Sequence, residues 1–213
     1  MRRFAVFVAS LMLLPHAIAA DDIDSLIQQA ESGNADAQFR LVKPYGQGIG
    51  VRKDPNKAKY WFSKAAESGH AEAQYWTGYN YFYGQGGERN LNKALQWYER
   101  SASQGYGPAQ FMAGYVHQMG HLLGDNIRPD LAKAVHWYQL AAAKDEIGAQ
   151  FHLGCFKYFG IGVAKNVVEA DALILKAANK GQRGAQQFMQ SKWKVNEKNL
   201  QKICDKHMNQ CKK

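Results

Sequence analysis

Long hydrophobic runs, cysteines and catalytic motifs are all scarce in this chain of 213 residues. The longest apolar stretch has about 11 residues, whereas a helix that spans a bilayer needs about 20. The chain has no G-x-S-x-G nucleophile motif and no G-x-x-x-x-G-K-[ST] phosphate loop. Its acidic residues are scattered, without a recurring inward-facing pair. We therefore expect neither a membrane-spanning protein nor an enzyme, and no cofactor.

The first 20 residues have the layout of a secretory signal peptide. A basic start at residues 1–3 precedes the apolar run from Phe4 to Leu14, and small residues follow at 17–20. We expect cleavage near Ala20 or Asp21, export to the periplasm of a bacterium, possible secretion, and no stable membrane insertion afterwards. A retained N-terminal anchor is the alternative.

Only three cysteines are present, at positions 155, 204 and 211. An exported chain can form disulfides. Along an unbroken helix, Cys204 and Cys211 would be about 10.5 Å apart, beyond the limit of about 7 Å between the Cα atoms of a bridge. A bridge between them requires the helix to end near His207. We hypothesise this Cys204–Cys211 bridge, with Cys155 as a small buried residue.

The positive charge is concentrated at the C-terminus. The formal net charge is +9, or +7 without Arg2 and Arg3. Residues 192–213 hold seven lysines against Glu197 and Asp205, which leaves the rest nearly neutral. A nucleic-acid binder would carry a basic stripe on its recognition surface, so we expect no nucleic-acid partner. The tail is either a solvated charged helix or a contact for an anionic partner or lipid surface.

One phrase recurs at intervals of 36, 36, 40 and 36 residues. It is Ala37-Gln38, Ala73-Gln74, Ala109-Gln110, Ala149-Gln150 and Ala185-Gln186. A second alanine recurs in phase, followed in three repeats by a tryptophan: Ala58, Ala94, Ala134, Ala170, Trp61, Trp97 and Trp137. A fixed period of this length is typical of stacked supersecondary units.

Each unit reads as two helices joined by a glycine turn. Ala73, Gly78 and Tyr81 share one helical face, and the run of glycines from Gly84 then ends that helix. We predict that the tryptophans pack between layers. Pro44 is predicted to kink or shorten the first helix of its repeat. The sequence has no strand signal.

These motifs resemble the Sel1-like repeat, a relative of the tetratricopeptide repeat. The shared pattern is A-x-A-Q-x-x-L-G, then G-x-G-V, then W-x-x-x-A-A-x-x-G, most fully matched in 48–69 and 149–163. The resemblance implies an all-α, right-handed α-solenoid of stacked antiparallel helix hairpins with a curved groove. The expected parts are a signal peptide at 1–20, a capping helix at 21–34, repeats at 35–70, 71–106, 107–146 and 147–182, and capping helices with a basic tail at 183–213.

Candidate binding residues lie on the expected concave face. In related solenoids the first helix of each unit lines this face, which here offers Tyr79, Tyr83, Tyr115, Met119, Cys155 and Phe159. Aromatic and methionine side chains are common in protein-binding surfaces. The alternative is that several of them belong to the core between repeats.

Departures from the repeat pattern mark further candidates. The third repeat has four extra residues between Gly120 and Lys133, and we expect its His121, Asn126 and Arg128 to assist binding. Drift in a tolerant loop is the alternative. The helix tyrosine of the repeat, present at Tyr45 and Tyr81, becomes His117 and Lys157 in the later units.

Metal-ligating patterns are weak. His117 and His121 are four residues apart, but the repeat's own glycine terminator separates them, so their rings are not expected to share a face. Cys204, His207 and Cys211 offer only three ligands, two of which a disulfide would consume. We predict no metal site.

The sequence therefore predicts a non-enzymatic periplasmic scaffold that binds a protein partner through its groove. The resemblance suggests one specific role, an immunity protein that neutralises a secreted antibacterial effector. The alternative is a cell-wall-directed protein that binds or acts on peptidoglycan or β-lactam-like substrates, because aromatic side chains can also stack on sugar rings.

Overall fold

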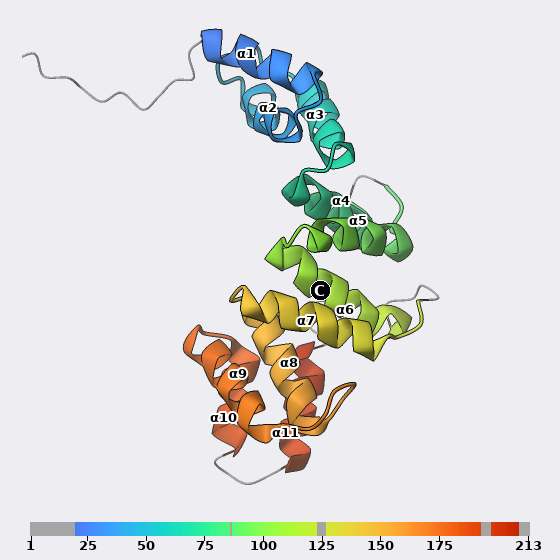
Figure 1. Cartoon of the computed structure of the whole chain (residues 1–213), viewed down its shortest axis with the longest axis vertical. Helices are drawn as coiled ribbons and strands as arrows, with labels where there is room; N and C mark the ends of the chain where they lie inside the picture. The colour runs from blue at the N-terminus through green and yellow to red at the C-terminus, as the bar shows by residue number, and fades with distance from the viewer. Residues whose placement is uncertain (1–19, 86, 123–126, 193–196, 209–213) are drawn as a thin grey trace, which may run out of the picture. The chain divides into compact units, whose positions relative to one another are not determined.

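The computed structural model describes residues 20–85, 87–122, 127–192 and 197–208. Over these residues the regular elements are eleven α-helices and one 3-10 helix, with no strand. The predicted all-α class is confirmed. The chain forms two compact units, residues 1–68 and 69–213, and each is described by itself (Figure 1). Residues 1–19 of the expected signal peptide lie outside the described residues.

Unit 1 contains the N-terminal cap and the first hairpin. Its helices are α1 (Ala20–Glu31), α2 (Ala35–Gln47) and α3 (Pro55–Glu67). Pro44 lies in the last turn of α2 and does not shorten it. Both α2 and α3 are 13 residues long. The carbonyl of Pro44 accepts hydrogen bonds from the backbone N–H groups of Gly48 and Ile49, at 2.8 and 3.1 Å. The prediction of a shortened helix was wrong, because a proline so close to a helix end removes a single helical hydrogen bond.

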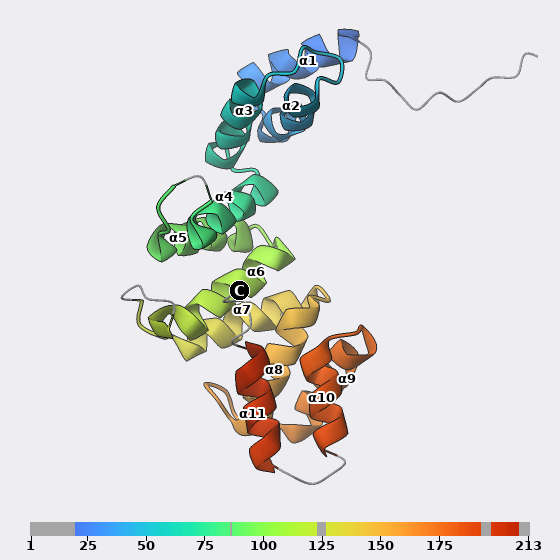
Figure 2. The same ribbon diagram turned by 180° about the vertical axis from the view of Figure 1, so that it is seen from behind.

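Unit 2 contains three hairpins and a C-terminal pair of helices (Figure 2). The hairpins are α4 (Ala71–Tyr83) with α5 (Leu91–Ser103), α6 (Gly107–Met119) with α7 (Leu131–Ala143), and α8 (Ile147–Phe159) with α9 (Val167–Asn179). A 3-10 helix, η1 (Gly120–Leu122), follows α6, and α10 (Arg183–Lys192) and α11 (Glu197–Met208) end the described chain.

Repeated polar residues begin the second helix of every hairpin. Asp54, Asn90, Asp130 and Asn166 are the N-cap residues of α3, α5, α7 and α9. Each side chain accepts a hydrogen bond from a backbone N–H in the first turn, which would otherwise have no partner. Each cap lies four residues before the second recurring alanine, at 58, 94, 134 and 170, so the second helix starts at an equivalent place in each repeat.

The glutamine of the Ala-Gln pair joins consecutive hairpins. Gln110 Nε2 donates to the carbonyl of Ala102 at 3.1 Å, and Gln186 Nε2 donates to that of Ala178 at 3.1 Å. In unit 1, Gln38 makes the same bond to Ala30 at 3.0 Å. Each bond satisfies a carbonyl at the C-terminal end of the preceding helix. A glutamine has the reach for this bond, which accounts for its recurrence.

Within each hairpin of unit 2, a glycine lies against a large buried side chain. A Cβ added at Gly78 would lie 2.8 Å from the ring of Tyr98, and one added at Gly114 would lie 2.8 Å from Tyr138. Gly154 faces Ile174 in the same way. The large residues of this column, Tyr98, Tyr138 and Ile174, are each 0% exposed. Glycine is required here because no other residue lets the two helices approach so closely.

This column corrects the predicted packing of the tryptophans. Trp61 is buried in the core of unit 1, but Trp97 and Trp137 are only half-buried. The fully buried position in unit 2 is one residue later, at Tyr98 and Tyr138. A rotation of about 100° per residue along a helix separates the two positions, so Trp97 and Trp137 border the core of unit 2, and Trp137 packs against its buried cluster.

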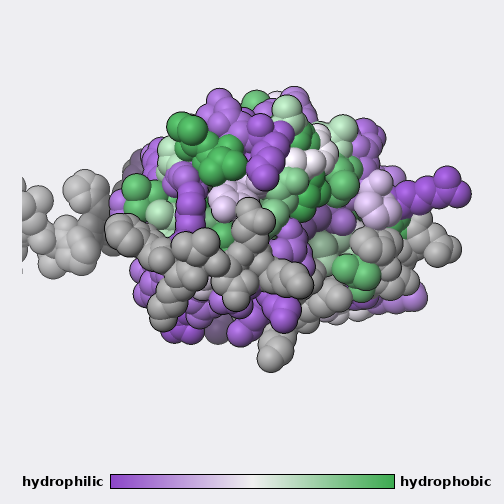
Figure 3. All heavy atoms as spheres, turned by 90° about the horizontal axis from the view of Figure 1, so that it is seen from below, coloured by the Kyte–Doolittle hydropathy of each residue, from purple (hydrophilic) through white to green (hydrophobic). Residues whose placement is uncertain are grey.

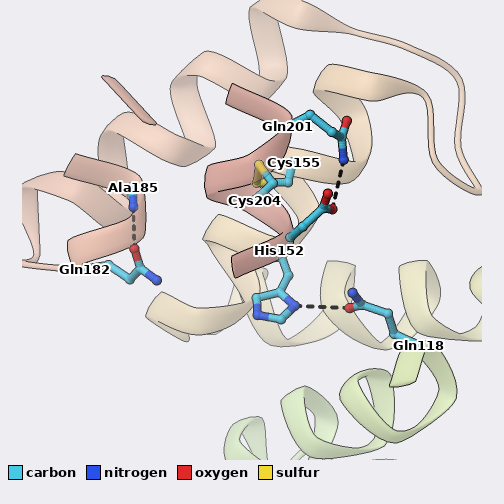
Figure 4. The surroundings of a disulfide bond; sticks show 8 residues. Gln118, His152, Cys155, Gln182, Ala185, Gln201 and Cys204 are labelled. Carbon is cyan, nitrogen blue, oxygen red and sulfur yellow. Dashed lines mark hydrogen bonds between the residues drawn. A yellow bond between two sulfur atoms is a disulfide. The ribbon is translucent and has the colours of Figure 1, made fainter. Parts of the chain in front are cut away.

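A disulfide joins α11 to α8 and corrects the predicted pairing. Cys204 is bonded to Cys155, with 6.1 Å between the Cα atoms (Figure 4). The Cys204–Cys211 prediction was wrong because α11 stays helical through Met208, and Cys204 faces α8 from its middle. Cys211 lies outside the described residues. Leu200, Ile203 and Cys204 belong to the same buried cluster as Cys155, so α11 covers the last full hairpin.

Candidate protein-binding surface

An aromatic stripe runs along α4 in unit 2. Trp76, Tyr79 and Tyr83 are spaced three and four residues apart, which places them on one side of the helix. The ring centroids of Trp76 and Tyr79 are 5.3 Å apart, and those of Tyr79 and Tyr83 are 4.4 Å apart. Trp76 is 41% exposed and Tyr83 is 38% exposed, while Tyr79 is half-buried. We call these three residues the α4 aromatic surface.

The same positions of α6 are in the core. Met112, Tyr115 and Met119 are 7%, 0% and 4% exposed. The ring of Tyr115 lies between that of Phe82 on α4, at 6.3 Å, and that of His152 on α8, at 6.2 Å. Tyr115 and Met119 were predicted to line an exposed groove, and that prediction was wrong. Neighbouring first helices pack closely enough in unit 2 to bury them.

The equivalent face of α8 is covered. Cys155 is bonded to α11, and Phe159 is half-buried against the C-terminal core cluster. Of the predicted groove residues, Tyr79 and Tyr83 therefore lie on an accessible surface, and Phe159 contributes to packing. The exposed Trp76 was missed. Its position one turn before Tyr79 was the available sequence signal.

The inserted loop of the third repeat follows an atypical helix end. Gly48, Gly84 and Gly160 close their helices in the left-handed conformation, but Gly120 keeps a right-handed φ of −51° and leads into η1. Arg128 is exposed, and its expected role in binding stays a prediction. The backbone of His121 lies in η1, but its side chain is outside the described part of the structure, as is the whole of Asn126.

Carboxylates border the aromatic surface. The indole N–H of Trp76 donates to Glu72 at 3.4 Å. The half-buried Tyr106, whose ring lies 5.4 Å from that of Tyr75, has a pKa raised first by burial and then by the charges of Glu72 and Glu146. Burial also raises the pKa of Tyr75 to about 12, with nearby tyrosines and Glu146 adding to the shift. A carboxylate therefore lies beside Trp76, at the N-terminal end of the α4 aromatic surface.

In the fourth repeat, where a lysine replaces the repeat tyrosine, the residue that contacts this position from the other helix of the hairpin changes as well. Tyr45 and Tyr81 each lie under a lysine, Lys57 at 5.2 Å and Lys93 at 5.4 Å from the ring centroid. In the fourth repeat the tyrosine becomes Lys157 and its partner becomes Glu169, and the two form an ion pair. The cation moves from one helix of the hairpin to the other, and the attraction between the helices is kept.

The third repeat uses a different partner at this position. The Nε2 atom of His117 lies 2.8 Å from an Oε1 atom of Glu99 on α5. His117 and Lys157 thus connect neighbouring helices, and neither departure marks a binding residue by itself.

A buried polar network lies between the third and fourth repeats (Figure 4). The Oε1 atom of Gln118 accepts from the hydroxyl of Tyr138 at 2.7 Å and lies 3.2 Å from Nδ1 of His152. Burial lowers the pKa of His152 to about 3. The imidazole is therefore neutral near pH 7, and its Nδ1–H donates to Gln118. Aromatic rings enclose it, among them Phe111 at 5.3 Å. This arrangement is a packed core and leaves no room for a substrate.

Pockets lie elsewhere on the described chain, and the larger of two, of about 620 Å³, is in unit 1 between Tyr45 and Lys57. A pocket of about 420 Å³ opens between α9 and α10 and is lined by Asp171, Ala172, Leu175, Met189 and Lys192. On the face shown in Figure 3, hydrophobic patches are separated by hydrophilic side chains. Among the described residues, no group of three or more His, Cys, Asp or Glu side chains could hold a metal ion. None of the described helices is both long and apolar enough to cross a membrane.

The repeat boundaries and hairpins identify the family. The Sel1 repeat model matches residues 35–70, 71–106, 107–146 and 147–182. This chain belongs to the Sel1 repeat family. Sel1 repeats generally serve as scaffolds that bind protein partners. None of the curated proteins compared with the chain matches it significantly.

Two solved Sel1 repeat structures are similar to this chain. A protective antigen of uropathogenic Escherichia coli strains, with an SLR fold, is 34% identical over 75% of this chain and 33% of its own, with a TM-score of 0.61. A Sel1 repeat protein from Oxalobacter formigenes is 31% identical over 81% of this chain and 49% of its own, with a TM-score of 0.65. The chain thus spans a third to a half of the length of these relatives.

An immunity protein from Pseudomonas aeruginosa is a more distant match. It is 18% identical over 75% of this chain and 74% of its own, with a TM-score of 0.42. A likeness this remote carries no argument about the partner of the present chain.

Proposed function

We propose that this chain is an exported, non-enzymatic scaffold of the cell envelope that binds a protein partner through the α4 aromatic surface. The observation that carries the proposal is the exposure of Trp76 and Tyr83, at 41% and 38%, where α6 buries the equivalent side chains. Tryptophan and tyrosine are enriched at the energetic centres of protein interfaces. Contiguous exposed apolar side chains are a feature of interaction sites on soluble proteins.

Two observations support the proposed location. Residues 1–20 have the signal-peptide pattern, and the Cys155–Cys204 disulfide is a bond that persists in oxidising compartments. The bacterial periplasm fits both. In this compartment the partner is a secreted antibacterial effector, which the chain neutralises as an immunity protein by stoichiometric binding. His121, Asn126 and Arg128 of the inserted loop add contacts at the edge of the interface.

A pull-down from periplasmic extract tests the proposal. The wild-type chain is expected to recover one stoichiometric protein, and Trp76→Ala and Tyr83→Ala are expected to lose it. Tyr60→Ala is the matched control, because Tyr60 is a similarly exposed aromatic residue, at 52%, on α3 of the other unit. Equal recovery by all variants, or no stoichiometric protein at all, would count against the proposal.

The cell-wall reading is the second candidate. Exposed rings such as Trp76 and Tyr83 can stack on sugars as well as on side chains. Co-sedimentation with purified peptidoglycan that is lost in Trp76→Ala, or turnover of a β-lactam substrate, would favour this reading over a protein partner.

A further inference from the structure

The structure holds its own example of a helix docked on a first helix of unit 2. The side chain of Cys155 on α8 is bonded to α11, and Leu200, Ile203 and Cys204 form the apolar stripe by which α11 joins the core cluster. Lys202 and Lys206 of α11 are exposed on its outer side. An amphipathic helix of 12 residues, basic on the outside, therefore fits this face of a repeat. Figure 2 shows α11 beside α8.

The α4 aromatic surface lies at equivalent positions of the second repeat. Cys155 and Phe159 on α8 correspond to Tyr79 and Tyr83 on α4, 76 residues earlier, which is one interval of 36 plus one of 40. Position 152, the equivalent of Trp76, differs, because His152 turns toward Gln118 in the preceding hairpin. The face that takes α11 on α8 is thus present on α4, with larger aromatic side chains.

Charge restricts the partner further. Glu72 lies beside Trp76, and Glu72 and Glu146 both act on Tyr106 at the N-terminal ends of α4, α6 and α8. A ligand that covers the aromatic stripe comes near the Glu72 carboxylate, and its own cations would also lie over the electron-rich faces of Trp76 and Tyr83. An acidic helix would be repelled at the same place.

We propose that the α4 aromatic surface takes a cationic amphipathic helix of the partner, in the position that α11 takes on α8. The apolar stripe of that helix packs on Tyr79 and Tyr83, and its lysines or arginines lie toward Glu72 and Glu146. The inference rests on the proposed function and adds the class of ligand to it.

The test uses the chain's own sequence as the probe. A labelled peptide of residues 197–213, with Cys204→Ala and Cys211→Ala, is titrated into the full-length oxidised protein, in which the disulfide keeps α11 on α8. A peptide of the same composition in scrambled order, and one with its lysines replaced by glutamates, are the controls. We expect saturable binding of the first peptide only, because its stripe and its charges both match.

Variants of the full chain locate the site. Trp76→Ala and Tyr83→Ala are expected to weaken binding by about tenfold or more, as truncation of an aromatic hot spot does. Glu72→Gln with Glu146→Gln should lower the salt dependence of binding, and Tyr60→Ala should leave the affinity unchanged. Circular dichroism of each variant shows whether it is folded.

Equal binding of the scrambled peptide, or an affinity that Trp76→Ala leaves unchanged, would overturn the inference. If no basic peptide binds while the recovered partner still depends on Trp76, the helix is the wrong ligand class and the proposed function stands. If neither the peptide nor a partner depends on Trp76, both proposals fail.

Discussion

The first helices of the second and fourth repeats, α4 and α8, have equivalent positions and opposite surroundings. On α8 these positions are closed by α11 and a disulfide, whereas on α4 they carry exposed aromatic rings. The repeat pattern alone makes the two helices look interchangeable. The comparison shows that the function of a repeat position depends on what packs against it, and that a C-terminal helix converts one surface into core.

The end of the repeat array shows a related change. Leu95 and Val116, and then Val135 and Phe156, are apolar pairs at equivalent positions of successive hairpins. The next pair is Asp171 and Lys192, which form an ion pair. At this position the described chain thus replaces an apolar contact with an ion pair, in contrast to the apolar α4 aromatic surface.

Removing the disulfide should reduce the difference between the covered face of α8 and the exposed face of α4. Of the changes considered, it should have the largest effect on stability. Cys155→Ala with Cys204→Ala is expected to lower the free energy of unfolding by about 4 kcal/mol, because the bridge closes a segment of 49 residues. Denaturant unfolding measures the change. Cys211→Ser is the control and should unfold like the wild type. A loss of stability in Cys211→Ser alone would restore the pairing that the sequence suggested.

Acid should lower the free energy of unfolding through His152 on α8. His152 has a folded pKa of about 3 and an ordinary unfolded value near 6.5, so the unfolded chain binds the extra proton first as the pH falls. The contribution of this residue to stability is complete above pH 6.5 and is lost below it, by about 1.4 kcal/mol for each pH unit down to pH 3.

The variant His152→Met isolates this effect from other acid-sensitive groups. It introduces the residue type that α6 has at the same position, Met112. We expect a shallower decline of unfolding free energy between pH 6.5 and 4 than in the wild type. Parallel curves for the two proteins would contradict the buried neutral imidazole.

Exchanging the charges in the fourth hairpin should make it resemble the second. Glu169→Lys places a second lysine beside Lys157 and is expected to destabilise the protein by about 0.5–1 kcal/mol, since the pair is partly exposed. Adding Lys157→Tyr recreates the arrangement of Tyr81 and Lys93 and should restore most of that loss. A double-mutant cycle measures the coupling, and additive effects would show that the two positions do not interact.

Truncating the α4 aromatic surface should have the smallest effect on folding. Trp76→Ala is expected to change the free energy of unfolding by about 1 kcal/mol or less, because the indole is 41% exposed and its contacts are with neighbouring rings and one long hydrogen bond to Glu72. Thermal unfolding measures this. A cost of several kcal/mol would mean that Trp76 is a structural residue.

Much of the fold could be predicted because the same sequence pattern recurs in each hairpin. The period of 36, the terminating glycines and the Ala-Gln pairs predicted helix hairpins. The interactions behind these signals are local: N-caps, left-handed glycines, and the glutamine bonds made by Gln38, Gln110 and Gln186. The aligned residues Gly78 and Tyr98 held a further signal, a small residue against a large one, that identifies the true core column.

The binding residues were harder to predict because burial depends on neighbours distant in sequence. Tyr79 and Tyr115 are equivalent by spacing, yet the helices on both sides of α6 bury only the second. The pairing of Cys204 likewise depends on where α11 docks, which no local pattern specifies. Sequence spacing gives the face of a helix, and tertiary packing decides whether that face meets water.

Chemical modification of individual tyrosines tests most directly whether α4 has an exposed aromatic surface where the equivalent positions of α6 and α8 are buried or covered. Nitration of the intact oxidised protein, followed by peptide mass spectrometry, compares Tyr83 with Tyr115, and uses the exposed Tyr60 as the reference. We expect Tyr83 to react about as readily as Tyr60, Tyr115 to be protected, and the basic peptide of residues 197–213 to protect Tyr83. Protection of Tyr83 in the free protein, or equal reaction of Tyr83 and Tyr115, would contradict this expectation.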